Sequence, residues 1–423
     1  MTTVVRNRPP IDALTSLRGV AALLVVVHHM GLLMLPLRGT VVGPALNNFG
    51  VLGMTTFFVL SGFVIHYNYA DRLAVERERG VISFMFARFA RLYPLYLPVV
   101  LINFMLNFGA AAYRGNQAAA NAYMTALPAN LAGMQSWFYA TFNGFNMTIA
   151  QGYANNSWSI SVEFLLYLIF IPIAMFGGFQ RHSLWRGIAL TVVAMVLRTV
   201  FIRIANQDVV VNGISQIWGT PQMIDATTWL VYYSPYGRFF EFLAGIGIAE
   251  IWLSSQGHSQ SARARLISRV LGLIAMAYIV GSVFDRSLYD LPELFGGYRL
   301  FSGYAIALPL AIYAICQSRN LLGKLASAAP LLLLGEISYS LYMLHGNLFP
   351  LFRVSAGDLA AKTPEMIWKS AAFLVILFVS SWLVYRYFEM PARRWIMNFY
   401  KRGMTPSSSP MAGAGTPQKA LEC

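Results

Sequence analysis

The sequence predicts an all-α membrane protein with about ten transmembrane helices and both termini in the cytoplasm. Of its 423 residues, 57% are hydrophobic and only 11% are charged, and the mean hydropathy is +0.55. Soluble domains carry about 25% charged residues, so a shortage of charge along the whole chain indicates many membrane spans. Apolar runs predict these spans at residues 11–35, 46–68, 92–110, 156–177, 187–204, 234–252, 270–284, 299–316, 330–350 and 367–387.

The basic residues predict the orientation of the spans, because cytoplasmic loops carry an excess of Lys and Arg. With the N-terminus inside, most of the 31 Lys and Arg residues fall on the inner side. Those that fall outside are Arg38, Arg114, Arg203, Arg286, Arg299, Arg353 and Lys362. The net charge of +14 is therefore explained by topology, and we expect no nucleic-acid partner.

Composition divides the chain into three parts. Residues 1–10 are predicted to be a cytoplasmic arm, residues 11–396 the membrane domain, and residues 397–423 a disordered cytoplasmic tail rich in Pro, Ser and Gly. The first apolar segment is too long for a cleavable signal peptide and lacks a small-residue cleavage site, so we expect it to remain as an anchor.

Three connections between the predicted spans stand out. Residues 69–91 are dense in charge and are interpreted as the main inner loop. Residues 111–155 and 205–233 are long outer segments with several aromatic residues, including Trp137 and Trp229. Such residues are ordinary anchors at the membrane interface, and the alternative is a shelf on which sugar rings stack.

The first span, "LTSLRGVAALLVVVHHMG", contains Arg18, His28 and His29. A charge at mid-bilayer costs on the order of 3 kcal/mol, so intramembrane ionisable residues usually face the interior of the bundle and serve a function. In a helix, Arg18 and His29 lie on one face, about 16 Å apart along the axis. His28 points about 80° away from that face, and we interpret it as structural.

Other ionisable and polar residues extend this pattern. Arg88 and Arg91 share a face at the inner mouth of the third span, and arginine forks suit phosphate oxygens. Glu163 is a lone carboxylate in the fourth span, where it would orient a histidine, steer a proton or tie a buried arginine. In the ninth span, Tyr342 and His345 continue a polar stripe that begins at Ser338. We expect no metal site.

Six segments together resemble the acyltransferase 3 family, integral membrane enzymes that O-acylate surface glycans and some small molecules. The resemblance covers residues 11 to 396 and follows the family's order. An arginine and a histidine eleven residues later, Arg18 and His29, match its first-helix signature. The other segments are "FFVLSGFVI", "RFARLYPLY", "SWSISVEF", "ISYSLYMLH" and "YFEMPARRW".

The resemblance implies an acyl-CoA co-substrate on the cytoplasmic side, with acetyl as the default group, and no permanently bound cofactor. It implies a glycan hydroxyl as acceptor and a location in the bacterial plasma (inner) membrane. His29 would act as general base or as acyl carrier. The candidate residues are His29 and Glu163 for catalysis, with Arg18, Arg88, Arg91, Trp158, Tyr342 and His345 for substrate binding.

Two alternatives remain at this point. The first is a small-molecule acceptor, as in antibiotic-tailoring relatives. The second is a proton-coupled transporter, which would also place ionisable residues among ten spans. Members of the family that carry a C-terminal hydrolase-like domain pass the acyl group to it, so here the chain's own helices or a separate periplasmic partner would finish the transfer.

Overall fold

The computed structural model describes residues 8–140, 148–151, 155–217, 226–256, 262–284, 299–317 and 325–404, and within these ranges the chain is helical with no strand. The main helices are α1 (Asp12–His29), α2 (Gly43–Glu76), α3 (Glu78–Tyr113), α4 (Gln117–Leu131), α5 (Trp158–Phe176), α6 (Leu184–Ala205), α7 (Asp208–Ile217), α9 (Pro235–Ser255), α10 (Ala262–Phe284), α12 (Arg299–Gln317), α14 (Ala329–Glu336), α15 (Ser338–Phe352), α16 (Leu359–Val384) and α17 (Met390–Met404). The all-α prediction is confirmed for the described residues.

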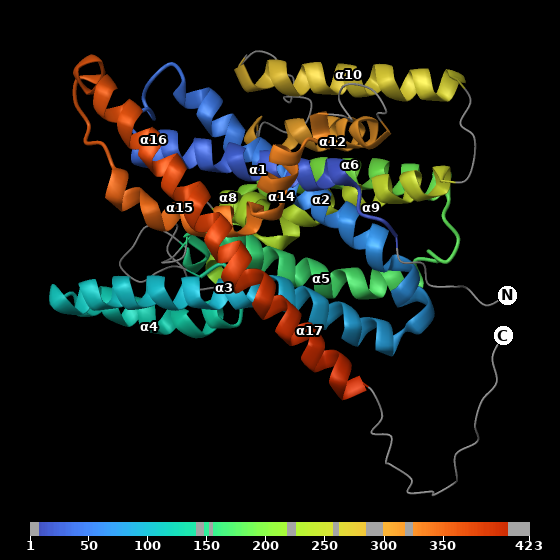
Figure 1. The fold of residues 1–423 in the computed structure, drawn as a ribbon, viewed down its shortest axis with the longest axis horizontal. Coiled ribbons are helices and arrows are strands. Elements are labelled where there is room, and N and C mark those ends of the chain that lie inside the picture. The colour runs from blue at the N-terminus through green and yellow to red at the C-terminus, as the bar shows by residue number, and fades with distance from the viewer. Residues whose placement is uncertain are drawn as a thin grey trace, which may run out of the picture.

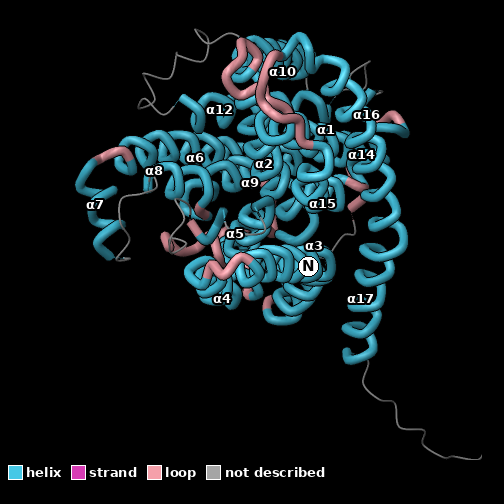
Figure 2. Tube along the Cα trace, turned by 90° about the vertical axis from the view of Figure 1, so that its left-hand side faces the viewer, coloured by secondary structure: helices cyan, strands magenta, loops and turns pink. Residues whose placement is uncertain are grey.

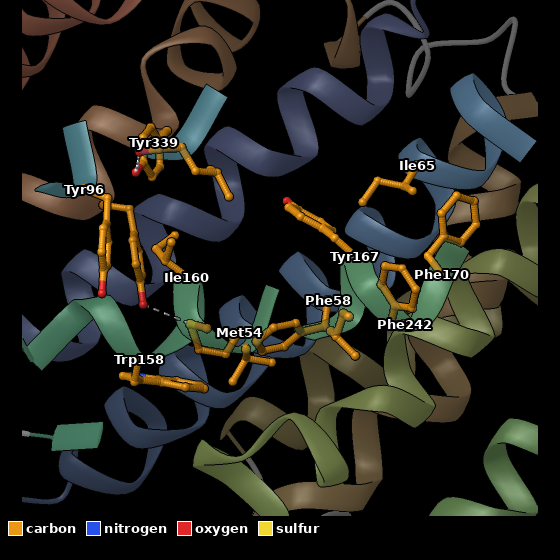
Figure 3. Close-up of a cluster of buried hydrophobic side chains, with 14 of the residues drawn as sticks. Met54, Phe58, Ile65, Tyr96, Trp158, Ile160, Tyr167, Phe170, Phe242 and Tyr339 are labelled. Atoms are coloured by element: carbon orange, nitrogen blue, oxygen red, sulfur yellow. Dashed lines mark hydrogen bonds between the residues drawn. The ribbon is translucent and has the colours of Figure 1, made fainter. Parts of the chain in front are cut away.

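Most of the helices run side by side along the long axis of the bundle (Figure 1). Helix α2 lies at the centre and packs against α1, α3, α5 and α9. Helices α10 and α12 cover one side, α3 and α4 the opposite side, and α16 with α17 forms a long column along the flank (Figure 2). The largest buried core joins side chains from these central helices, including Phe58, Tyr96, Trp158, Phe170 and Phe242 (Figure 3).

Seven helices of the described chain are long and apolar enough to cross a membrane. They are Asp12–Met34, Gly43–Glu76, Glu78–Tyr113, Trp158–Phe176, Leu184–Ala205, Leu266–Phe284 and Leu359–Arg402. A multi-pass membrane protein is thereby supported, whereas the count of ten and the orientation of the termini stay predictions. Helix α9 matches the predicted span 234–252 but carries Arg238, Glu241 and Glu250, which lower its apolar character.

Three predicted boundaries are wrong. Residues 69–91 are not a loop, because α2 and α3 continue through them and only Arg77, at φ 44°, separates the two helices. The predicted span 330–350 is two helices, broken at Ile337, where the hydroxyl of Ser338 donates to the Gly335 carbonyl at 2.7 Å.

The third wrong boundary is the start of the tail. Helix α17 includes residues 397–404, which composition assigned to the disordered segment. Tyr400 stacks on Phe86 of α3, with ring centroids 4.8 Å apart. This contact packs the C-terminal part of α17 against α3. The rest of the predicted tail and residues 1–7 of the arm lie outside the described residues.

Helices α2 and α9 approach closely because each has a glycine at the crossing. A Cβ at Gly245 would lie 2.0 Å from the carbonyl oxygen of Val59, and a Cβ at Gly62 would lie 2.0 Å from that of Phe242. Small residues let helix backbones meet in this way in membrane proteins. The two glycines therefore fix the spacing of the central helix pair.

We expect Gly245→Ala to destabilise the protein by about 1–3 kcal/mol, because the added methyl group must push the α2 backbone away. Thermal unfolding of the purified protein in detergent measures this loss. Gly109→Ala is the matched control, since Gly109 lies in α3 with nothing within 4 Å of its Cβ position. Equal unfolding temperatures for the two variants would contradict the packing argument.

Candidate active site

Three predicted arginines meet at one cavity inside the bundle. Arg18 comes from α1, and Arg88 and Arg91 come from α3. Glu163 of α5 and Tyr342 of α15 line the same cavity, so the structure brings together five of the predicted site residues from four helices. The empty space is about 700 Å³, its open mouth included. Apolar side chains of α2, such as Phe57 and Phe58, form much of the remaining wall.

The cavity carries more positive than negative charge. Three guanidinium groups face a single carboxylate, Glu163, which accepts a short hydrogen bond from the hydroxyl of Tyr167. Arg88 donates to the Tyr69 hydroxyl at 2.9 Å, but the Nε atoms of Arg18 and Arg88 are buried without a hydrogen-bond partner. Buried cations that lack partners are costly, so the cavity is suited to an anion that supplies the missing contacts.

His29 does not line this cavity but pairs with His345. Nδ1 of His29 lies 2.9 Å from Nε2 of His345, and the two rings stack with centroids 5.1 Å apart. Nδ1 of His345 lies 2.6 Å from the Tyr342 carbonyl oxygen, which can only accept, so that nitrogen carries the proton. Nε2 of neutral His345 then accepts from His29, and the lone pair of His29 is placed on its Nε2.

A short chain of polar contacts joins the histidine pair to the arginine cavity. The Ser159 hydroxyl, which lines the cavity, lies 2.9 Å from the Tyr342 hydroxyl and 3.3 Å from the Asn156 carbonyl oxygen. The Asn156 side-chain amide donates to the Tyr342 carbonyl at 3.1 Å. The same carbonyl fixes the His345 tautomer. Ser159, Tyr342 and Asn156 thus form a polar layer that lies between the arginine cavity and the two histidines.

The local helix geometry changes directly after His29. Residues Met30–Met34 form a π-helical turn instead of continuing α1. Such turns are rare, and they occur frequently at functional sites. His28 lies outside the pair, since its Nδ1 is 2.9 Å from the Leu46 carbonyl oxygen, and this contact agrees with its structural interpretation.

Two predicted site residues have different surroundings from those expected. The sequence predicts that Glu163 orients a histidine, steers a proton or ties a buried arginine, but its carboxylate accepts a hydrogen bond from the Tyr167 hydroxyl, and it is His345 that lies beside His29. Trp158 is only 5% exposed and packs against Tyr232 and Tyr233, outside the lining of the cavity. Trp158 therefore lies outside the arginine cavity and beside Arg238, whose guanidinium carbon is 5.7 Å from the centroid of its ring.

The buried arginines Arg198 of α6 and Arg238 of α9 pair with Glu241 and not with Glu163. Arg238 donates two hydrogen bonds of 2.9 Å to Glu241, and Arg198 lies 3.0 Å from the same carboxylate. The outer aromatic residues Tyr139 and Trp229 are buried against each other, so their rings are not exposed for sugar rings to stack on. Phe142 and Trp218, which belong to the same outer segments, lie outside the described residues.

Sequence reasoning missed four residues that support the site: Tyr69, Tyr167, Ser159 and Asn156. Tyr69 and Tyr167 contact Arg88 and Glu163, and an aromatic residue in an apolar helix gives no sign of such a role. Ser159 is the middle one of three serines that alternate along the chain, Ser157, Ser159 and Ser161, and residues two apart do not share a helix face. Asn156 precedes α5, where an asparagine is typical of a helix start, so its contact with α15 was not evident.

A second polar cluster joins α2, α9 and the segment directly before α6. Ligand atoms of His66, His182 and Glu250 lie within 4.8 Å of one another, a spacing that suits a metal ion. However, Arg186 already binds Glu250, Arg8 lies 3.0 Å from His182, and Nδ1 of His66 has no hydrogen-bond partner. Metal-bound histidines almost always donate from the second ring nitrogen, so the residues favour an ion-pair cluster.

His182 gives this cluster a pH dependence. Burial opposes its protonation, but hydrogen bonds to Asp71 and Glu250 outweigh burial and raise the pKa of His182 from 6.5 to about 8. Protonated His182 therefore stabilises the fold below about pH 6.5, and this contribution is lost as the pH rises through about 8. We expect the unfolding temperature to fall across this window in the wild type and to fall less in His182→Gln. Parallel curves for the two proteins would contradict the assignment.

Comparison with known proteins gives one family over nearly the whole chain. Residues 11–386 match the model of a family described as "Acyltransferase domain". The chain is 23% identical over 410 residues to the peptidoglycan O-acetyltransferase OatA of Listeria monocytogenes, covering 93% of this chain and 58% of that protein. It is 24% identical to the putative peptidoglycan O-acetyltransferase YrhL of Bacillus subtilis, covering 90% of this chain and 55% of that protein.

A third relative is matched over almost all of its length. The chain is 27% identical to acyltransferase MdmB of Streptomyces mycarofaciens, covering 91% of this chain and 92% of that protein. By contrast, the chain spans little more than half the length of the two peptidoglycan relatives. No solved structure matches the chain.

Proposed function

Because the chain belongs to the acyltransferase domain family, we propose that it is a membrane O-acyltransferase that moves an acyl group from acyl-CoA to a glycan hydroxyl. One observation carries the proposal: a cavity with three arginines and one carboxylate lies a single polar layer away from a hydrogen-bonded histidine pair. The arginines are suited to hold the donor, and the histidines are suited to perform the transfer.

The donor is acyl-CoA, with acetyl as the acyl group, and it enters the arginine cavity from the cytoplasmic side. The negatively charged CoA phosphates balance the positive charge of Arg18, Arg88 and Arg91 and accept hydrogen bonds from these side chains. The pantetheine arm follows the apolar wall of α2 and brings the thioester to the polar layer of Ser159 and Tyr342.

His29 acts as the general base. Its Nε2 removes the proton from the acceptor hydroxyl while the hydroxyl oxygen attacks the thioester carbonyl carbon. The carbon–sulfur bond then breaks, and the CoA thiolate takes up the proton. In the alternative order, Nε2 itself attacks the carbonyl carbon, the carbon–sulfur bond breaks and the CoA thiolate leaves; the acceptor hydroxyl then attacks the acyl-imidazole, which releases His29 as the hydroxyl proton is transferred. His345 holds His29 in the required tautomer in both cases.

The acceptor is a cell-surface or lipid-linked glycan, in line with the names of the OatA and YrhL relatives, in the bacterial plasma (inner) membrane. A separate periplasmic protein is the alternative last carrier of the acyl group. A small-molecule hydroxyl is the second candidate acceptor, and the chain matches acyltransferase MdmB over 92% of that protein's length. Family membership argues against a proton-coupled transporter.

The test is an assay of the purified protein in lipid vesicles. Supplied with acetyl-CoA and membrane glycans, it should release free CoA and add an acetyl mass increment to the glycan. Cells with and without the protein should differ by the same increment. Release of no CoA under any acceptor condition would overturn the proposal, and movement of a solute without CoA release would indicate a transporter.

A further inference from the structure

A second cavity lies on the other side of the histidine pair from the arginines. It encloses about 1080 Å³ of empty space, its open mouth included, between α3, α15 and the segment before α5. Four asparagines face it, Asn103, Asn107, Asn156 and Asn347, and no charged residue of the described chain contributes to its lining. This composition contrasts with that of the arginine cavity, and the proposed donor leaves the second cavity without an assigned ligand.

The second cavity adjoins the reacting histidines. Phe349, which lines it, packs edge-on against His345 at 5.5 Å and against His29 at 6.3 Å between ring centroids. Asn156, also in the lining, is 8% exposed, and its amide nitrogen lies 3.3 Å from Nδ1 of His345. The Asn156 backbone carbonyl accepts a hydrogen bond from Ser159 of the arginine cavity, so residues that line the two cavities are in direct contact.

The amides on α3 leave acceptor atoms available. Asn103 and Asn107 are one helical turn apart, and each side-chain NH₂ donates to the carbonyl one turn earlier, at 2.8 and 2.7 Å. The Oδ1 atom and the second N–H of each amide therefore remain for a ligand, and a carboxamide both accepts hydrogen bonds from hydroxyls and donates to them. An anionic group would find no cation in this lining, so the matching ligand is uncharged and rich in hydroxyls.

The rim of the cavity is apolar and exposed. Ile102 and Leu106, on the same helix as the two asparagines, are 51% and 66% exposed. In a membrane protein such side chains face hydrocarbon, which places the opening toward lipid. An acceptor that arrives on a lipid chain would lay its chain along this rim and its sugar against the amides.

We propose that this asparagine cavity binds an uncharged sugar unit carried on a lipid and presents its hydroxyl to His29. The inference rests on the proposed function, because it assigns the acceptor half of the same reaction. It also predicts that donor and acceptor reach the histidine pair from opposite cavities without displacing each other.

Thermal-shift binding in lipid nanodiscs tests the assignment with defined probes. A long-chain alkyl glucoside should stabilise the wild-type protein, whereas methyl glucoside and a long-chain alkyl glucuronide should stabilise it at least about tenfold less effectively. The double variant Asn103→Leu, Asn107→Leu should bind the alkyl glucoside at least about tenfold more weakly. Asn121→Leu is the matched control, because Asn121 is an exposed asparagine on α4, outside the lining.

The outcomes separate this assignment from the proposed function. Stabilisation by CoA should persist in the double variant, which shows that the variant is folded and that its arginine cavity is intact. Absence of alkyl-glucoside stabilisation in the wild type, or equal stabilisation of the double variant, would overturn the asparagine site. Equal effects of methyl and alkyl glucosides would overturn the lipid-borne acceptor in favour of a soluble one. Absence of any effect of CoA would count against the proposed function instead.

Discussion

Replacing His29 by alanine should abolish acyl transfer, with kcat falling by about 10²–10⁴-fold or more, because the variant loses the imidazole that takes the hydroxyl proton in the proposed mechanism. His29 contributes the lone pair on Nε2, and His345 is itself held with its proton on Nδ1 by the Tyr342 carbonyl. The measurement is CoA release with acetyl-CoA and a glycan acceptor, in vesicles that contain equal amounts of folded protein.

His28→Ala is the control for this prediction. His28 is the neighbouring histidine on the same helix, but its ring contacts the Leu46 carbonyl instead of His345, so its variant should keep transfer. His345→Ala should lower the rate less than His29→Ala and should shift the pH profile, because it removes the group that fixes the tautomer. Full activity in His29→Ala would disprove the assignment of the base.

The double replacement Arg88→Ala, Arg91→Ala should raise the KM for acyl-CoA by about 10²-fold or more while changing kcat less. Each charge-assisted hydrogen bond to a phosphate contributes about 1.5–3 kcal/mol, which corresponds to about tenfold or more in affinity. Steady-state kinetics with varied acyl-CoA measures the change. The effect is expected to be large because three guanidinium groups and a single carboxylate line the cavity, so an anionic ligand gains more charge-assisted contacts than it loses.

A donor without phosphates identifies the origin of the effect. With acyl-pantetheine in place of acyl-CoA, the wild type and the double variant should have similar KM values, since no phosphate remains for the arginines. Arg79→Ala is the matched control, because Arg79 is exposed on the same helix and does not line the cavity. An unchanged KM for acyl-CoA in the double variant would remove the arginines from the donor site.

The sequence predicted several of the residues that line the arginine cavity. The period of an α-helix places Arg18 and His29 on one face, and Arg88 and Arg91 one turn apart, whatever packs against them. The order of six motifs identified the family, and the match over residues 11–386 confirmed it. These features depend only on positions within single helices or on the linear order of segments.

Contacts between different helices were harder to predict from the sequence. The sequence offered Glu163 as the partner of a histidine, because both are ionisable groups in apolar helices, yet Glu163 contacts Tyr167 and His29 contacts His345. His345 lies 316 positions away along the chain. No local period relates two residues so far apart, so their pairing follows from how α1 and α15 pack.

By itself, the sequence determined that this is a helical membrane protein of the acyltransferase family and which face of its first helix carries the arginine and the histidine. The tertiary structure alone decided which side chains meet. Three arginines line one cavity, His29 and His345 form a hydrogen bond, and asparagines line a second cavity. The physical reason is that helix periodicity is set by backbone geometry within a few residues, whereas partners across helices are set by close packing of distant segments.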